Sequence, residues 1–124
     1  MTGFIYVSWE ELEEEVTKLA IRILDRLKPD GLVCVGRGGL IPTAMLSDAL
    51  SVDNIGFLGA RRYVGICKGG EMKVYTFIPP PRQSKVLLLI DDVADTGETL
   101  KKAKNFISSV YKGDIYTATI HYKP

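Results

Sequence analysis

Three carboxylates and a group of hydroxyl residues stand close together in the second half of the chain. Asp91 and Asp92 are adjacent, Asp95 follows, and Thr96-Gly97-Glu98-Thr99 comes directly after it. Two neighbouring carboxylates repel each other unless a hydroxyl-rich sugar or a divalent cation shares their negative charge. The Thr-Gly-Glu-Thr turn opens a predicted helix, whose first backbone N–H groups are unpaired and favour a phosphate. Together these residues indicate a site for a phosphorylated ribose.

A second loop whose residues could bind a ligand, Gly36-Arg37-Gly38-Gly39, lies earlier in the chain. Its glycines let the backbone adopt positive φ and approach a ligand closely. Arg37 adds a forked guanidinium, which pairs well with phosphate oxygens. The loop follows an apolar run and opens a helix, an arrangement typical of a diphosphate cradle. A tight turn with a surface arginine is the alternative interpretation of the same residues.

Both loops are expected to lie at the ends of buried strands. Residues 32–35 and 86–90 are short apolar runs without a polar face, as in strands buried on both sides of a parallel sheet. In open α/β sheets, ligands bind beyond the carboxyl ends of the strands. Apolar residues at helical spacing follow the acidic loop and predict a helix there: Leu100, Ala103, Phe106, Ile107 and Val110. We therefore predict an α/β fold, with an open, mostly parallel twisted sheet flanked by helices.

The remaining elements follow from periodicity and capping signals. Residues 4–7 predict a short strand, and Ser8 with Glu11 forms a capping-box pattern for a helix that runs to about Lys28. A second helix begins at about Leu40. A final strand is predicted at residues 115–122, which alternate and are rich in β-branched and aromatic residues.

A basic, glycine-bearing stretch follows a short strand predicted at residues 55–58. Two strand-like pieces flank residues 68–71, where Gly69-Gly70 predicts a hairpin turn. Such an excursion near the active end of a sheet is expected to be a flexible hairpin loop that closes over a substrate. Lys68 is one candidate cation, and the others in this stretch are Arg61, Arg62 and Lys73. An exposed basic hairpin without a catalytic task is the alternative.

Bulk properties place the chain among ordinary globular proteins. Its 124 residues, 46% hydrophobic and 25% charged, predict one domain over residues 1–124. The net charge of +1 gives no reason to expect nucleic acid or a membrane as partner. Cys34 and Cys67 have no spacing that indicates zinc or a disulfide framework. The acidic start argues against a signal peptide, and no apolar run could span a bilayer, so we expect a cytoplasmic protein.

The stretch of residues 87–100 resembles the phosphoribosyl diphosphate (PRPP) signature of the type I phosphoribosyltransferases. Leu-Leu-Leu-Ile-Asp-Asp-Val-Ala-Asp-Thr-Gly-Glu-Thr-Leu has both acidic positions and the Thr-Gly-x-Thr turn in register. Arg37-Gly38 resembles the diphosphate-binding loop of that family. Lys123-Pro124, after the last predicted strand, resembles the xanthine-guanine type of purine enzyme, in which the lysine donates to the 6-oxo oxygen of the base. A solvent-facing lysine is the alternative interpretation.

The resemblance implies transfer of a phosphoribosyl group from PRPP to a purine base, most simply a 6-oxopurine, with Mg²⁺ as cofactor and Asp92 as its ligand. Asp91, Asp92, Asp95 and Arg37 are the implied catalytic residues, and Asp95 faces N7 of the purine. The implied substrate-binding residues lie in both loops, the hairpin and the chain end: Arg37, Gly38, Gly39, Lys68, Asp91, Asp92, Val93, Ala94, Asp95, Thr96, Gly97, Glu98, Thr99 and Lys123.

The sequence departs from that family at its end, because the related chains continue with a hood that carries a base-stacking aromatic residue. We therefore expect self-association, as a dimer, to cover apolar surface there. A non-catalytic regulator that binds PRPP or a nucleotide is an alternative of a different class. A phosphoryl enzyme with a nucleophilic aspartate is a third, but that chemistry wants a second aspartate two residues after Asp91, where Val93 stands.

Overall fold

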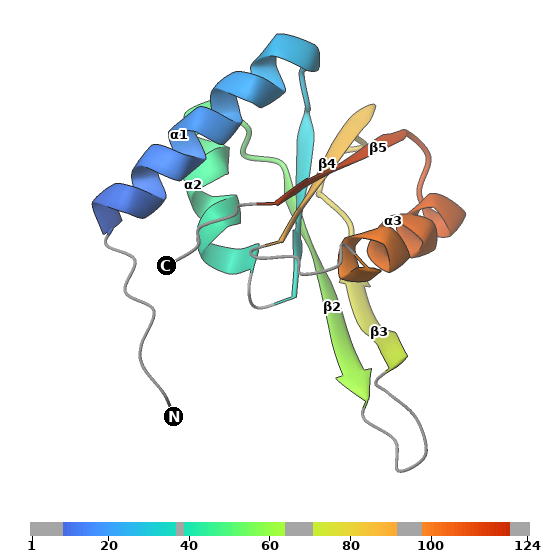
Figure 1. The fold of residues 1–124 in the computed structure, drawn as a ribbon. Coiled ribbons are helices and arrows are strands. Elements are labelled where there is room, and N and C mark those ends of the chain that lie inside the picture. Colours follow the sequence, from blue (N-terminus) through green and yellow to red (C-terminus); the bar gives the residue numbers. More distant parts are fainter. Residues whose placement is uncertain (1–8, 37–38, 64–70, 92–97, 120–124) are drawn as a thin grey trace, which may run out of the picture.

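A computed structural model describes residues 9–36, 39–63, 71–91 and 98–119 of the chain (Figure 1). The helices and strands of these segments follow one another in a mostly alternating order: α1 (Trp9–Arg26), β1 (Gly31–Val35), α2 (Leu40–Leu50), β2 (Ile55–Tyr63), β3 (Glu71–Ile78), β4 (Val86–Asp91), α3 (Glu98–Val110) and β5 (Asp114–Thr119).

The five strands form one sheet in the order β3-β2-β1-β4-β5. β1 pairs in parallel with both β2 and β4, and β4 pairs in parallel with β5. Only the β2–β3 pair of this sheet is antiparallel. The prediction of a mostly parallel sheet flanked by helices is confirmed.

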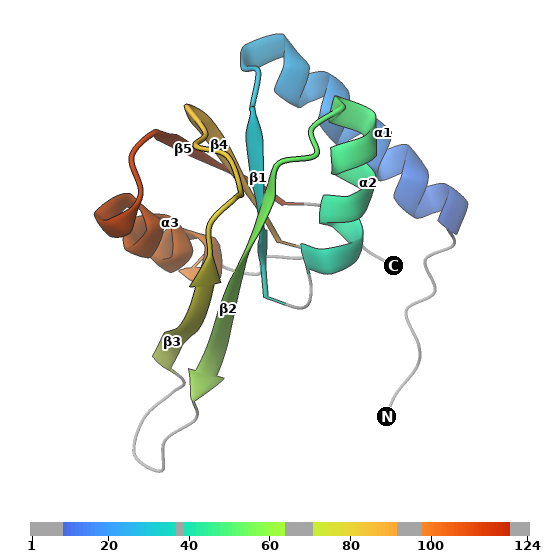
Figure 2. The same cartoon turned by 180° about the vertical axis from the view of Figure 1, so that it is seen from behind.

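Helices cover both faces of the sheet, with α1 and α2 on one side and α3 on the other (Figures 1 and 2). Alternate residues of the central strands serve the two faces, as their pleat requires. Leu32, Leu88 and Ile90 pack with α1 and α2, whereas Val33 and Leu89 pack with α3. All five side chains are buried, which explains why these strands read as unbroken apolar runs.

The structure corrects the prediction for the middle of the chain. A short strand at residues 55–58 and a separate hairpin piece were expected, but β2 is one strand from Ile55 to Tyr63. Its pairing with β3 runs from Phe57 opposite Ile78 to Tyr63 opposite Glu71, with an irregularity between Gly59 and Ala60. Pairing with β3 therefore extends β2 over a stretch that has no alternating apolar pattern of its own.

Other predicted elements are found with small shifts. α1 ends at Arg26 rather than at Lys28, and α3 begins at Glu98, two residues before Leu100. The strand expected at residues 4–7, the Ser8 cap and the Gly69-Gly70 turn lie outside the described residues. No helix in the described segments is long and apolar enough to cross a membrane.

A hydrogen-bond network joins the amino ends of the central strands. The Asp30 carboxylate, just before β1, accepts hydrogen bonds from the Ser84 hydroxyl and from the backbone N–H groups of Lys85 (3.1 Å) and Val86 (2.9 Å). Desolvation acts to raise the pKa of the exposed Asp30, but these hydrogen bonds together outweigh it and lower the pKa below its ordinary value of 3.8. The network fixes β1 against β4.

Asn54 extends this network to the segment that leads into β4. Its buried side-chain amide donates to the carbonyl oxygens of Asp30 (3.2 Å) and Arg82 (2.8 Å), and its side-chain oxygen accepts from the Arg82 N–H (2.8 Å). The sequence patterns gave no sign of these contacts, because their partners are far apart in the chain.

Candidate active site

The glycine-arginine loop and the acidic loop follow two neighbouring parallel strands. Cys34 of β1 lies opposite Ile90 of β4, so the residues that come next along each strand are side by side at the carboxyl edge of the sheet. β1 ends at Val35 and β4 ends at Asp91. The sheet thus places the starts of both predicted loops together, at the edge where open α/β sheets bind their ligands.

Gly39 shows how closely the first loop approaches the end of β4. Its backbone is buried against the end of β4, and a Cβ atom added to it would collide with the carbonyl oxygen of Ile90. The nearest side-chain atom to that position, the Cys34 sulfur, would be 3.4 Å away. A glycine is therefore required where the first loop crosses the end of β4 and α2 begins.

Gly36 has a different requirement, because its φ angle is +62° and the space around it is open. This left-handed conformation turns the chain away from β1, and the Gly36 N–H donates to the carbonyl oxygen of Leu58 in β2 (2.7 Å). The first loop is therefore fixed at one end to β2 and at the other end to β4.

Asp91 is the last residue of β4, and its side chain is 9% exposed. Its charge reaches Cys34 of the neighbouring strand and helps to raise the pKa of the thiol. Burial is the larger cause of that shift, and the Thr43 hydroxyl opposes it in part. Cys34 is therefore a neutral thiol, which donates a hydrogen bond to the Gly36 carbonyl (3.3 Å). A carboxylate with little exposure at this edge can interact strongly with a bound cation or hydroxyl.

Two helix starts also face this edge. α2 begins immediately after Gly39, which provides no side-chain cap for its first N–H groups. The backbone of Glu98 and Thr99 forms the first turn of α3, as the predicted phosphate turn requires. Unpaired amides at a helix start are donors for an anion.

The structure therefore positions Gly39, Asp91, Glu98 and Thr99 at the carboxyl side of β1 and β4. β2 and β3 extend past the ends of these strands on the same side (Figure 1), where the flexible hairpin loop was predicted. The remaining predicted site residues lie outside the described part of the chain: Arg37, Gly38, Lys68, Asp92, Val93, Ala94, Asp95, Thr96, Gly97 and Lys123.

Sequence reasoning missed two residues beside the first loop, Cys34 and Thr43. Cys34 was excluded from metal and disulfide chemistry, and Thr43 carries no motif. Both are buried next to the loop, between β1 and α2. The signal that could have found them is the position of Cys34 at the end of a buried strand, directly before a ligand-binding loop.

Comparison with known protein families shows the family of this chain. Residues 6–124 match the sequence profile of the phosphoribosyl transferase domain, and the chain is a member of that family. The prediction of a phosphoribosyltransferase is confirmed at this level.

Two curated relatives have the same name. A xanthine-guanine phosphoribosyltransferase of Idiomarina loihiensis is 31% identical over 96 residues, which is 77% of this chain and 60% of that protein. Another from Desulfotalea psychrophila is 30% identical over 110 residues, which is 89% of this chain and 68% of that protein. The chain thus spans less than two thirds of the Idiomarina protein.

Solved structures show the same fold. A purine phosphoribosyltransferase from Pyrococcus horikoshii aligns with a TM-score of 0.75 and 29% identity, over 93% of this chain and 75% of that chain. A Helicobacter pylori xanthine-guanine-hypoxanthine phosphoribosyltransferase aligns with a TM-score of 0.78 and 23% identity, over 90% of this chain and 73% of that chain.

Proposed function

We propose that this chain transfers a phosphoribosyl group from PRPP to a purine base and releases diphosphate and a nucleoside 5′-monophosphate. The observation that carries this proposal is the packing of Gly39 against the Ile90 carbonyl. This contact sets a glycine-arginine loop directly beside a strand that ends in a carboxylate. Membership of the phosphoribosyl transferase family supports the reaction class, and the relatives named for xanthine and guanine support a 6-oxopurine.

Each end of PRPP has a proposed partner. The 5-phosphate binds the turn from Asp95 to Thr99 and the first amides of α3, while the ribose hydroxyls bind Asp91 and Asp92. The diphosphate binds Arg37 and the amides of residues 36–39. As the C1–O bond breaks, positive charge grows on the ribose and the carboxylates stabilise it. The Arg37 guanidinium stabilises the departing anion.

The purine-binding residues and the flexible hairpin loop complete the proposed site. Asp95 faces N7 of the base and holds or accepts its proton. Lys123 donates to the 6-oxo oxygen, which an ammonium group prefers over an amino group. Lys68 of the flexible hairpin loop approaches the diphosphate when this loop closes over the substrate and excludes water.

Mg²⁺ is the proposed cofactor, with Asp92 as its protein ligand. The described residues contain no group of three or more side chains able to hold a metal ion. Mg²⁺ typically uses one or two carboxylates, water and substrate phosphates rather than an all-protein cage, and the adjacent Asp91 and Asp92 could supply such carboxylates. A buried carboxylate at Asp91 supplies the matching oxygen chemistry at the same edge. When bound, the ion would neutralise charge on the leaving diphosphate.

Calorimetry with PRPP and Mg²⁺ tests the site. We expect Asp92→Asn and Arg37→Ala each to weaken PRPP uptake at least about tenfold, since one charge-assisted contact contributes about 1.5–3 kcal/mol. Arg82→Ala is the matched control, because Arg82 is exposed and pairs with Asp53 away from the site. Uptake that is unaffected by both site substitutions would contradict the proposal.

An assay of diphosphate release with PRPP and a panel of purines separates the two classes of function. Release with guanine, xanthine or hypoxanthine is the result expected of the transferase. Tight PRPP uptake without release on any base would favour the alternative, a regulator that binds PRPP or a nucleotide.

We further propose that copies of the chain self-associate as a dimer. Ile21 and Leu24 of α1 are 59% and 50% exposed, and their spacing places them on one side of the helix. Exposed apolar side chains that cluster in this way are typical of interaction surfaces. We also propose a cytoplasmic location, with which the free thiol of Cys34 is compatible.

A further inference from the structure

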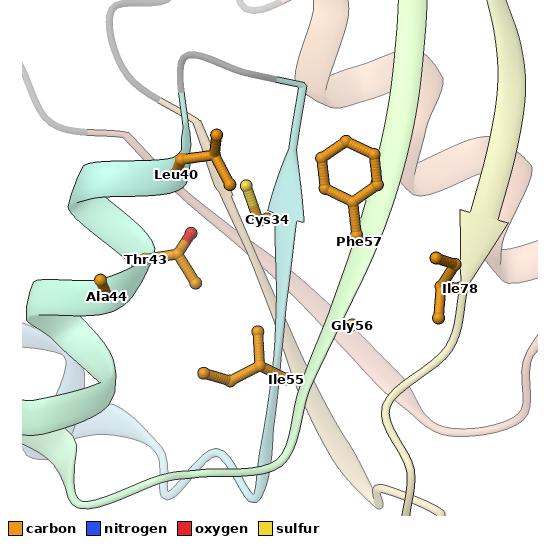
Figure 3. Close-up of a pocket in the computed structure, with 8 residues that line it drawn as sticks. All are labelled: Cys34, Leu40, Thr43, Ala44, Ile55, Gly56, Phe57 and Ile78. Atoms are coloured by element: carbon orange, nitrogen blue, oxygen red, sulfur yellow. The ribbon is translucent and has the colours of Figure 1, made fainter.

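A groove of about 280 Å³ lies between the first turns of α2 and strands β1, β2 and β3 (Figure 3). Leu40, Ile55, Phe57 and Ile78 are the large apolar side chains that line it. Leu40 and Ile78 are more than half exposed, so they form the open rim. The lining contains no ionised side chain, because its only titratable group, the Cys34 thiol, has a raised pKa.

Thr43 gives this apolar groove one polar feature. Its side chain is 3% exposed, and its hydroxyl oxygen is the one buried side-chain polar atom of the described residues that has no hydrogen-bond partner. Figure 3 shows this oxygen directed away from the axis of α2, toward the space beside Cys34 and Leu40. A buried hydroxyl without a partner is unfavourable, and a ligand that supplies the missing bond removes that cost.

Cys34 satisfies the Thr43 hydroxyl only in part. The Thr43 O–H acts on the Cys34 sulfur, a weak acceptor, and so opposes the rise of the thiol pKa, but this leaves the oxygen lone pairs of Thr43 open. The Cys34 thiol proton is donated to the Gly36 carbonyl at 3.3 Å rather than to Thr43. The helix geometry also matters, since a mid-helix threonine commonly bonds to the preceding turn of its own helix. No such bond is present for Thr43, so its oxygen can accept a hydrogen bond from a molecule in the groove.

We propose that this groove is a second binding site, for a small, neutral, flat molecule that is mainly apolar and has one polar group facing Thr43. The volume sets the size class, because a cavity of about 150 Å³ holds one benzene ring and this groove has nearly twice that space. Two fused rings or a substituted single ring therefore fit. The apolar walls exclude a phosphorylated ligand, which distinguishes this site from the PRPP site.

The groove is coupled to the diphosphate loop by shared residues. Leu40 begins α2 immediately after Gly39, and the Cys34 thiol is bonded to Gly36 at the start of the loop. A ligand in the groove thus contacts the supports of both ends of the loop, and we expect it to change PRPP affinity. This coupling rests on the proposed function, whereas binding in the groove does not.

Indole is the probe for binding, because it is neutral and bicyclic and has one N–H donor for the Thr43 oxygen. In ¹H–¹⁵N spectra of the full chain, we expect saturable shifts at Thr43, Ala44, Ile55 and Phe57. Ala44→Leu should fill the groove and abolish these shifts. Ala49→Leu is the matched control, since Ala49 is exposed on the same helix and does not line the groove; its indole binding should be unchanged.

The role of the hydroxyl is tested by comparing indole with benzothiophene, which has the same shape but no N–H donor. The wild-type chain should prefer indole about fivefold, the value of one ordinary hydrogen bond. Thr43→Val keeps the volume and should remove this preference while benzothiophene still binds. A preference that survives in Thr43→Val would overturn the role assigned to Thr43.

Three results would overturn the site itself. These are the absence of saturable shifts with indole, shifts that persist in Ala44→Leu, and shifts at the same residues caused by raising protein concentration alone. The last result would mean that another copy of the chain fills the groove. PRPP titrations with and without indole test the coupling separately. If PRPP affinity is unchanged by indole, the coupling is wrong, and if PRPP does not bind at all, it is the proposed function that fails.

Discussion

At the scale of single residues, Gly36 and Gly39 serve the same loop for different physical reasons. Gly36 needs a positive φ angle, and Gly39 needs the space that a side chain would occupy. The glycine-rich motif was visible in the sequence, but which glycine meets which constraint depends on β4, whose residues come much later in the chain. The glycine-rich motif predicts where the loop lies. Whether a given glycine is needed for its φ angle or for space depends on the strand packed against it.

Gly39→Ala is expected to weaken PRPP binding at least about tenfold, because the new Cβ atom would collide with the backbone of Ile90 and displace the loop from β4. Gly36→Ala is the comparison. It has open space and should mainly lose stability, by about 1–2 kcal/mol for a left-handed alanine. Calorimetry with PRPP and thermal unfolding of both variants measure the two effects. Equal PRPP affinities for wild type and Gly39→Ala would show that this contact does not position the loop.

Asp30 is expected to make stability depend on pH. Its pKa is below 3.8 in the folded chain, so the folded state binds fewer protons than the unfolded state at acidic pH. The stabilisation is therefore present above about pH 4 and is lost as the pH falls through the lowered pKa. Urea unfolding of wild type and Asp30→Asn should show a larger difference at pH 7 than at pH 2.5.

Ser84→Ala provides the companion measurement. Ser84 is 1% exposed and its hydroxyl donates to Asp30, so its removal should raise the pKa of Asp30 toward 3.8 and reduce the acid sensitivity. A stability difference between wild type and Asp30→Asn that stays constant with pH would contradict this account.

At the scale of elements, apolar runs predicted the strands that are buried on both faces, and spacing predicted the helices. The same reasoning failed where an element depends on a partner. β2 continues through Arg61 and Arg62 because β3 pairs with it, and the two arginines give no strand pattern of their own. The Asp30–Ser84 and Asn54–Arg82 contacts were equally invisible, since hydrogen bonds between distant residues leave no periodicity.

Asn54 and Asp53 offer a test of how the segment before β4 is held. Asn54→Ala should cost roughly 2–3 kcal/mol of unfolding free energy, because it removes three part-buried hydrogen bonds between the buried Asn54 side chain and the backbone of Asp30 and Arg82. Asp53→Ala should cost much less than Asn54→Ala, although Asp53 and Arg82 are only 2.6 Å apart, because both side chains are exposed. Denaturant unfolding measures both. Equal costs for the two neighbours would contradict the distinction.

At the scale of the whole molecule, the sequence predicted a mostly parallel sheet but not the order of its strands. That order puts β1 between β2 and β4, and so places the strand ends where the glycine-arginine and acidic loops start side by side. The resemblance to the phosphoribosyltransferase signature located the candidate site more completely than periodicity did. The described structure adds the contact between Gly39 and the end of β4, while the roles of the chemistry-bearing side chains stay predictions.

Self-association is a property of the whole molecule and can be tested by sedimentation equilibrium. Replacing both Ile21 and Leu24 with glutamate should shift the chain toward monomer, since it puts charge on the exposed apolar side of α1. Arg22→Glu, at an exposed position on another side of the same helix, is the control and should not change the distribution. A wild-type chain that is strictly monomeric at working concentration would contradict the proposed dimer.

The central place of β1 also governs how the chain acquires its structure during synthesis. Leu32 pairs with Leu88, so one edge of β1 has no partner until the ribosome has produced β4. Until then the nascent chain presents an unpaired apolar strand, the kind of surface that favours aggregation and that chaperones recognise. Translation speed between β1 and β4 should therefore affect the yield of folded protein.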